Sequence, residues 1–181
     1  IKAMKKTLNN SMRIMEKVAC IYDWCYDRIK ELGAQGVTSR VDGKPLSTET
    51  IAKIIYTHGV YSGYRAVTGW GVGPNGSRAQ GNITNFYKQY NNWNGVCSNG
   101  MIMGALVIMN PEEHNFTVQT PDDDTTDVEG RIFKVFEECF YGLTSVGCDQ
   151  YAPDGSYSEG TSYWSYGTGR IFTTATVLVN T

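Results

Sequence analysis

The chain has 181 residues, with 16 Lys and Arg against 18 Asp and Glu, and a formal net charge of −2. This balance excludes the basic footprint of a nucleic-acid-binding protein, and no apolar run is long enough to span a membrane. The length suits one domain with a real hydrophobic core. Aromatic residues make up 12% of the chain, which suits either a packed helical core or a groove that stacks sugar rings.

The cysteines and histidines are not spaced as in a metal site or a redox site. The cysteines are odd in number, show no C-x-x-C spacing and mostly fall within helical patterns, which favours core positions: Cys20, Cys25, Cys97, Cys139 and Cys148. His58 lies on the apolar face of an expected helix, and His114 follows an acidic loop. Two distant histidines do not form a metal site, so we expect neither a metal nor a cofactor.

Residues 1–33 predict one long helix, or two helices in line, that is apolar on two sides. One seam is formed by Met15, Val18, Tyr22, Cys25, Ile29 and Leu32, and a second stripe by Ile14, Ile21 and Trp24. A helix of this kind is expected to be buried between neighbours. After a loop over residues 34–46, Ser47 or Thr48 is expected to cap a helix that runs to about Val67.

Residues 68–90 form a long glycine-rich stretch. Its Gly71-x-Gly73-x-x-Gly76 spacing matches a dinucleotide-binding fingerprint, but no strand precedes it and Pro74 lies inside it, so we do not expect dinucleotide binding. A loop of this length in a compact domain is often functional. We therefore expect Trp70 and Arg78 to lie on the rim of a cleft that the helix start at Asn92 also borders.

Three further helices are expected after this loop. The first covers residues 92–109, where Gly100 and Gly104 would permit close helix contact. The acidic residues of 122–129 lack the glycine and terminal glutamate of a calcium loop, so we expect a solvated loop with a helix cap near Thr126 or Asp127. The next helix ends near Leu143, and the last covers about 159–180. This order predicts an all-α fold of antiparallel helical hairpins, an incomplete α/α toroid, in a single domain over residues 1–181.

Two short polar stretches stand at helix starts. Pro153-Asp154-Gly155 is a tight-turn signal, and Tyr163 and Tyr166 beyond it share a helical face. The asparagines of 91–94 open the other helix, where Asn is favoured as a cap. Two such helix starts predict the floor of a polar cleft, although both stretches could equally be well-formed helix starts only.

Together the two stretches resemble the heparinase II/III-like polysaccharide lyases. The resemblance lies in Asn91-Asn92-Trp93-Asn94-x-Val96-Cys97-x-x-Gly100, then Pro153-Asp154-Gly155-Ser156-x-x-Glu159-Gly160-x-x-Tyr163-Trp164-x-Tyr166-Gly167, with weaker signals at Tyr22-Asp23-Trp24 and His58-Gly59. It implies a bacterial, periplasmic or secreted enzyme that acts on an acidic polysaccharide such as a glycosaminoglycan. It also implies an α/α toroid followed by a β-sandwich domain. Because this chain starts at Ile1 and lacks that domain, we expect a fragment of a larger lyase.

The resemblance also implies residue roles. β-Elimination beside a uronic acid needs a neutralised carboxylate, a base and an acid. Asn92 matches the residue that holds the carboxylate, and Tyr163 the base or acid, with Tyr166 as the alternative. Position 93, often His in relatives, is Trp93 here, and another His of the relatives comes from the β domain, so this chain alone is expected to lack part of the site. The expected substrate-binding residues are Asn91, Trp93, Trp70, Glu159, Trp164 and Arg78.

Two other functions remain open. One is an α/α-toroid glycoside hydrolase, which would pair Asp23 with Asp154 or Glu159, although the sequence shows no obvious carboxylate pair. The other is a non-catalytic carbohydrate-binding fragment. In that case Asn92 and Glu159 would only cap helices and Tyr163 would only pack a hairpin.

Overall fold

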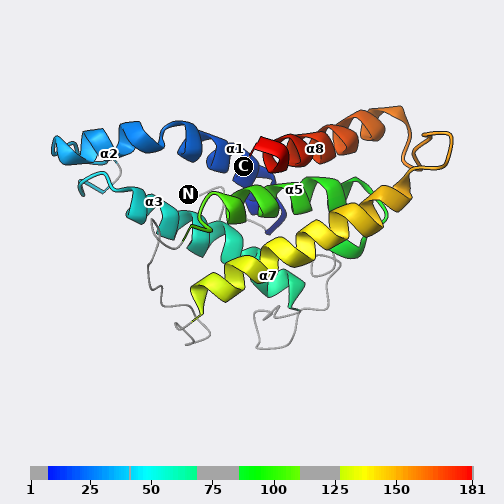
Figure 1. Ribbon diagram of the computed structural model, residues 1–181, viewed down its shortest axis with the longest axis horizontal. Coiled ribbons are helices and arrows are strands. Elements are labelled where there is room, and N and C mark those ends of the chain that lie inside the picture. Colours follow the sequence, from blue (N-terminus) through cyan, green and yellow to red (C-terminus); the bar gives the residue numbers. More distant parts are fainter. Residues whose placement is uncertain (1–7, 41, 69–85, 111–126, 181) are drawn as a thin grey trace.

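The computed structural model describes residues 8–40, 42–68, 86–110 and 127–180, and these ranges contain helices but no strand (Figure 1). The α-helices are α1 (Leu8–Trp24), α2 (Tyr26–Ala34), α3 (Thr48–Ile55), α4 (Tyr61–Val67), α5 (Asn92–Leu106), α7 (Val128–Tyr141) and α8 (Thr161–Asn180). The all-α prediction is therefore confirmed. Of the described helices, none combines the length and the apolar character that crossing a bilayer requires.

The first helical region consists of two helices in line, α1 and α2, which are separated at Cys25. Met15 and Tyr22 of the predicted seam are buried in the core. The prediction that α1 is buried on two sides is wrong, because Ile21 is 59% exposed and Trp24 is 81% exposed. α1 packs on α5 and α3–α4 with one face, and nothing in the described part of the chain covers these two side chains. Cys25 is exposed at the same break, so its predicted core position is also wrong.

α3 and α4 form one continuous helical rod through a π-helical segment, Tyr56–Val60. Ser47 caps the start of α3, as predicted, because its side chain accepts a hydrogen bond from the Thr50 amide at 3.3 Å. Gly59 does not end the rod but lets α1 approach closely. A Cβ added at Gly59 would lie 1.7 Å from the terminal methyl group of Met15.

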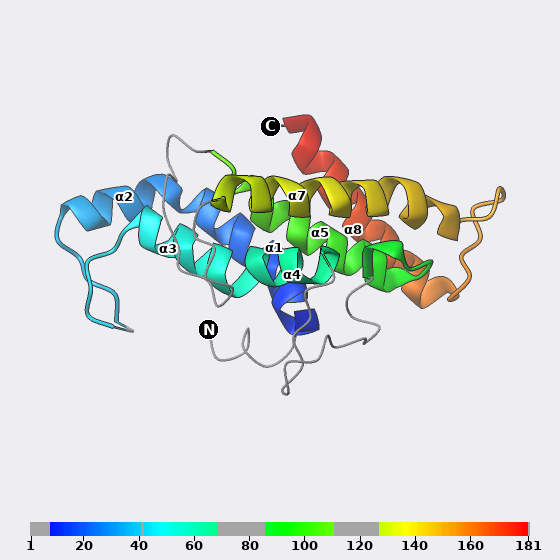
Figure 2. The same ribbon diagram turned by 90° about the horizontal axis from the view of Figure 1, so that it is seen from below.

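α5 is the centre of the fold. All of Asn92–Ala105 except Trp93 is buried, because α5 lies between α1 and α8 on one side and α7 on the other (Figures 1 and 2). The predicted close contact at its glycines is confirmed. A Cβ on Gly100 would lie 1.9 Å from the carbonyl oxygen of Met12, and one on Gly104 would lie 2.5 Å from the Met15 side chain. Gly95 faces the backbone of Gly167 in α8 less tightly, since a Cβ there would lie 3.4 Å from the Gly167 carbonyl oxygen.

Successive helical segments run in alternate directions. In the view of Figure 1, α1, α5 and α8 run from right to left, whereas α3–α4 and α7 run from left to right. α7 packs against both α5 and α4. The described helices therefore follow one another in antiparallel order, as the sequence predicts.

The region before α8 positions the predicted site. Asp127 caps α7, as expected, because it accepts a hydrogen bond from the Gly130 amide at 2.9 Å. α7 then continues into a π-helical segment, Gly142–Gly147, and a 3-10 turn, Cys148–Gln150. The predicted tight turn follows, with Gly155 at φ 81 and the Ser156 amide donating to Asp154 at 2.9 Å. α8 begins only at Thr161, so the predicted place of Glu159 inside this helix is wrong, and the residue belongs to the preceding turn.

Candidate functional site

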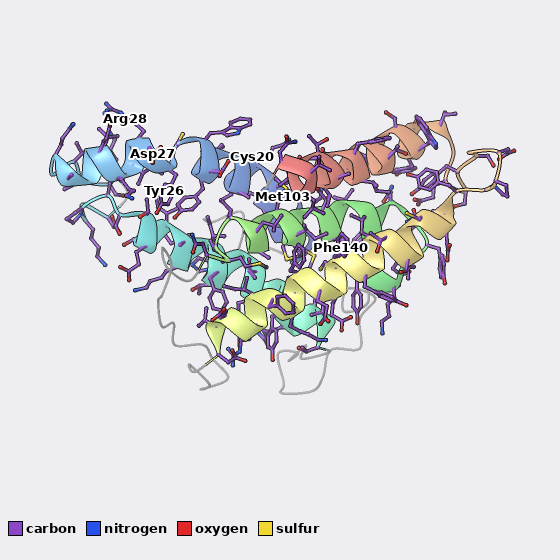
Figure 3. The ribbon with its side chains drawn as sticks, in the orientation of Figure 1. Cys20, Tyr26, Asp27, Arg28, Met103 and Phe140 are labelled. Atoms are coloured by element: carbon purple, nitrogen blue, oxygen red, sulfur yellow. The ribbon has the colours of Figure 1, made fainter. Side chains whose placement is uncertain are left out.

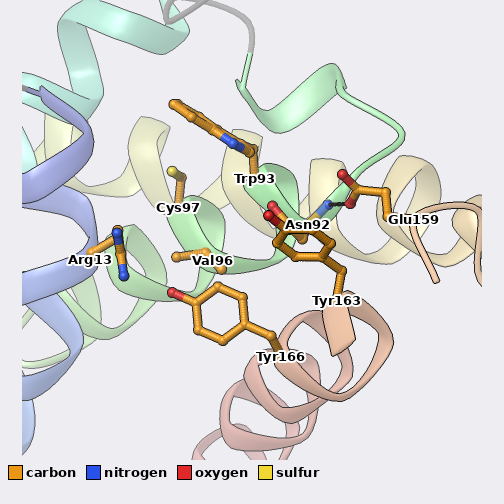
Figure 4. Close-up of a pocket in the computed structure, with 8 residues that line it drawn as sticks. All are labelled: Arg13, Asn92, Trp93, Val96, Cys97, Glu159, Tyr163 and Tyr166. Carbon is orange, nitrogen blue, oxygen red and sulfur yellow. Dashed lines mark hydrogen bonds between the residues drawn. The ribbon is translucent and has the colours of Figure 1, made fainter. Parts of the chain in front are cut away.

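A cleft of about 340 Å³ lies where the first turns of α8 meet the start of α5 and one side of α1 (Figure 4). Its lining residues are Arg13, Asn92, Trp93, Val96, Cys97, Glu159, Tyr163 and Tyr166. The structure thus brings together all three predicted catalytic residues and two predicted substrate-binding residues. Of the other predicted binding residues, Asn91 and Trp164 are not among the lining residues. Trp70 and Arg78 lie outside the described residues, so the prediction that Trp70 and Asn92 border one cleft stays a prediction.

The two asparagines at the start of α5 have different roles. Asn91 is the helix cap, since its side-chain oxygen accepts a hydrogen bond from the Trp93 amide at 3.1 Å. Asn92 comes one residue later, and its side chain faces the cleft although the residue is only 6% exposed. Among the described residues no hydrogen bond to the Asn92 side-chain amide is found. The side-chain amide, which can donate two hydrogen bonds, therefore has no protein partner from that part of the chain.

Glu159 ties the turn before α8 to the start of α5. Its Oε2 atom accepts a hydrogen bond from the backbone amide of Asn92 at 2.6 Å and lies 3.3 Å from the Tyr157 hydroxyl (Figure 4). A carboxylate at this position also interacts favourably with the helix dipole of α5. Glu159 therefore holds Asn92 in place, although the two residues are 67 positions apart in sequence.

Tyr157 completes this tether. Its hydroxyl donates to Gln150 Oε1, and both residues are buried. Burial, followed by the nearby Glu159 carboxylate, raises the pKa of Tyr157 well above its ordinary range. The hydroxyl therefore keeps its proton and remains a hydrogen-bond donor at the pH of any ordinary assay.

We expect Glu159→Ala to lower the free energy of unfolding by about 2 kcal/mol, because it removes a charged acceptor from a backbone amide. Glu159→Gln keeps an acceptor and should cost about 1 kcal/mol through the lost charge at the helix start. Urea denaturation monitored by circular dichroism measures both values. The matched control is Glu129→Ala, which removes another first-turn carboxylate, that of α7, and should cost about 0.5 kcal/mol. Equal costs at Glu159 and Glu129 would show that the tether contributes nothing.

Asn94 is structural. Its side-chain nitrogen lies 2.8–3.2 Å from the carbonyl oxygens of Tyr87, Gln89 and Gly142, and its oxygen accepts from Ser98 at 2.8 Å. The side chain is completely buried. It therefore joins α5 to the segment before it and to the end of α7, and it is not available to a ligand.

Arg13, Val96 and Cys97 are lining residues that sequence reasoning missed. Figure 4 shows the hydroxyl end of Tyr166 pointing toward Arg13, which comes from α1. Arg13 has no ion-pair partner within the described ranges. Burial raises the pKa of the Cys97 thiol to about 12, so at neutral pH it is not ionised and cannot act as a nucleophile. No motif could have identified Arg13, since its place in the cleft depends on the packing of α1 against α5.

The accessible surface of the cleft is aromatic and polar. Trp93 is 41% exposed and Tyr163 is 50% exposed, so both rings can contact a ligand. Tyr166 is partly buried, and the Arg170 guanidinium lies 5.2 Å from its ring centroid. Flat rings beside hydrogen-bond donors and a cation suit a sugar that carries a negative charge.

The carboxylate pairs expected for a hydrolase do not meet in this cleft. Among the described residues that line the cleft, Glu159 is the sole acidic one, and it already accepts a hydrogen bond from the backbone amide of Asn92. Asp23 lines a different groove between α1, α5 and α8. Cys20 and Met103, which are labelled in Figure 3, line the same groove. Asp154 is exposed in its turn, where hydrogen bonds from Ser156 hold its carboxyl pKa below the ordinary range. Neither predicted pairing therefore places two carboxylates around a common ligand position.

Comparison with known family models, curated proteins and solved structures finds no match for this chain. The assignment of function therefore depends on the two sequence motifs and on the geometry of the cleft. In the described part of the chain, no group of three His, Cys, Asp or Glu side chains is placed to hold a metal ion.

Proposed function

We propose that the protein is a polysaccharide lyase that cleaves a uronic-acid-containing polysaccharide by β-elimination. The observation that carries this proposal is the meeting of Asn92, Tyr163 and Tyr166 in one cleft, to which Arg13 adds a cation. These residues come from three helices that are far apart in sequence. Their side chains supply the two kinds of group that elimination needs, a neutraliser of the carboxylate and a carrier of protons.

Asn92 and Arg13 neutralise the substrate carboxylate. The proton on the carbon beside a carboxylate is weakly acidic because removing it places more negative charge next to an anion. The Asn92 amide can donate two hydrogen bonds to the carboxylate, and Arg13 can add a charge-assisted one. Both groups would stabilise the charge that develops on the carboxylate as the proton leaves.

Tyr163 or Tyr166 transfers the protons. Tyr163 is the first candidate, and Tyr166, one turn along α8, is the alternative. A phenolate oxygen takes the proton from the carbon beside the carboxylate, and the electron pair of that C–H bond forms a new carbon–carbon double bond. The glycosidic C–O bond breaks at the next carbon, and its oxygen leaves with a proton from a tyrosine hydroxyl. The products are an unsaturated sugar end and a new free hydroxyl.

We also propose that the helices form part of an α/α toroid. The alternation of α1, α5 and α8 with α3–α4 and α7 supports this, since a toroid is built from successive antiparallel hairpins (Figures 1 and 2). The same family resemblance supports an acidic polysaccharide as the partner, a β-sandwich domain as a companion of the helical domain, and a periplasmic or secreted location.

The test is product absorbance. Elimination places the new double bond in conjugation with the carboxylate. The protein together with its proposed β-sandwich domain, incubated with a panel of uronic-acid polysaccharides, should therefore generate an ultraviolet-absorbing product. Reducing ends without absorbance would indicate a hydrolase and contradict the proposal. Binding without either product would indicate a carbohydrate-binding protein and would also contradict it.

A further inference from the structure

A second hollow of about 310 Å³ adjoins the cleft between α1 and α8. It is lined by Arg13, Ile14, Lys17, Val96, Tyr166 and Arg170. Arg13, Val96 and Tyr166 also line the candidate site, so the two hollows are immediate neighbours. The next sugar of a chain molecule bound in the candidate site would therefore lie against the second hollow.

The second hollow is positively charged. Arg13, Lys17 and Arg170 line it, and the carboxylate in contact with two of them is Glu16. The Glu16 side chain is 7% exposed and is not among the lining residues, whereas the Lys17 side chain is 68% exposed and lines the hollow. Three positive charges against one negative charge leave these four side chains with a net charge of +2. The positive groups are thus the ones that a ligand meets.

Arg170 is held in place before any ligand arrives. Its Nη1 atom pairs with Glu16 Oε2, and its guanidinium lies 5.2 Å from the centroid of the Tyr166 ring. Glu16 is fixed in turn by Asn99, whose side-chain nitrogen donates to it at 3.0 Å, and Asn99 accepts from Thr174 at 2.6 Å. This buried network connects α1, α5 and α8. A cation that is oriented in advance loses little conformational entropy when an anion binds.

We propose that the second hollow is a subsite for an anionic group, a carboxylate or a sulfate, on the sugar next to the one that undergoes elimination. The substrate is then a polysaccharide with negative charges on consecutive sugars rather than only on alternate ones. The identity of the ligand as a sugar rests on the proposed function. The charge of the hollow and the lining residues that it shares with the cleft do not depend on the proposed function.

The test compares two matched pairs of tetrasaccharides by isothermal titration calorimetry. The first pair is chondroitin with and without sulfate on the hexosamine, and the second is tetragalacturonate with all or only alternate carboxylates present. The member with consecutive charges should bind about tenfold more tightly in at least one pair, since it gains a charge-assisted hydrogen bond. This preference should shrink as salt is added.

Lys17→Gln removes one cation from the rim and should weaken binding of the preferred member about two- to fivefold, while leaving its partner unchanged. The matched control is Lys53→Gln, which removes a lysine paired with Glu49 at 2.6 Å on α3 and should change neither affinity. Equal binding of both members in each pair, or a preference that Lys17→Gln leaves intact, overturns the subsite.

The subsite and the proposed function fail in different ways. An ultraviolet-absorbing product without any preference for consecutive charges overturns the subsite alone. A preference that depends on Lys17, without an absorbing product from any uronic-acid polysaccharide, contradicts the lyase and leaves the subsite standing. Absence of binding to all four tetrasaccharides overturns the subsite, whatever the product assay gives.

Discussion

Tyr163→Phe is expected to lower kcat for β-elimination by about 10²- to 10⁴-fold, the usual contribution of a positioned proton-transfer group. The substitution removes one hydroxyl and keeps the ring. No hydrogen bond of the Tyr163 hydroxyl is found among the described residues, and the ring is half exposed, so the stability should be unchanged. KM should change little, because the aromatic surface remains. The rate of increase in ultraviolet absorbance gives kcat and KM separately.

Two further variants locate the proton-transfer group. Tyr141→Phe removes the hydroxyl of a tyrosine with similar exposure on α7, away from the cleft, and should leave kcat unchanged. Loss of activity in Tyr166→Phe with retained activity in Tyr163→Phe would assign the role to the next turn of α8. Full activity in both variants would remove tyrosine from the mechanism.

Gly100→Ala is expected to destabilise the protein by about 3 kcal/mol, at the upper end of the usual cost of overpacking. The added methyl group would meet the carbonyl oxygen of Met12 at 1.9 Å, and backbone cannot rotate away as a side chain can. α1 would have to move away from α5. Urea denaturation measures the loss, and activity at a fixed fraction of folded protein should also fall, because Arg13 lies on α1 and Asn92 on α5.

Gly169→Ala is the matched control for this prediction. Gly169 is also inside a helix, α8, but a Cβ there would meet no side chain and no other element of the described residues within 4 Å. Alanine should therefore stabilise the protein by about 0.5–1 kcal/mol, because it reduces the backbone freedom of the unfolded chain. If Gly100→Ala were as stable as Gly169→Ala, α1 would not pack on α5 as the structure describes.

The features that the sequence predicts well are local ones. Ser47, Asn91 and Asp127 act as helix caps because a short side-chain oxygen can reach the free amides of the first turn, and residue type alone indicates this. Gly100 and Gly104 predict close packing for a similar reason. The spacing of Tyr163 and Tyr166 in α8 places both on the face that lines the cleft.

The features that the sequence does not predict depend on which helices pack against one another. Periodicity identifies two apolar stripes on α1 but cannot show that one of them, at Ile21 and Trp24, stays uncovered by the described helices. The sequence places Glu159 at the start of the last helix, whereas in the structure it lies in the turn before α8 and bonds the start of α5. The pairing of Arg170 with Glu16 joins residues 154 apart in sequence, beyond the reach of any local pattern. Arg13 lines the cleft only because α1 packs against α5, which no local pattern shows.

The most direct test of the account is the mass of the reaction products, measured after incubation of the protein with a defined uronic-acid oligosaccharide in ¹⁸O-labelled water. Elimination breaks the glycosidic bond without adding water. We therefore predict that the two fragments together have the mass of the substrate and carry no ¹⁸O from the bond cleavage, with one fragment unsaturated. Fragments that together weigh one water molecule more than the substrate, with ¹⁸O incorporated at the cleaved bond, would show hydrolysis and contradict the lyase mechanism.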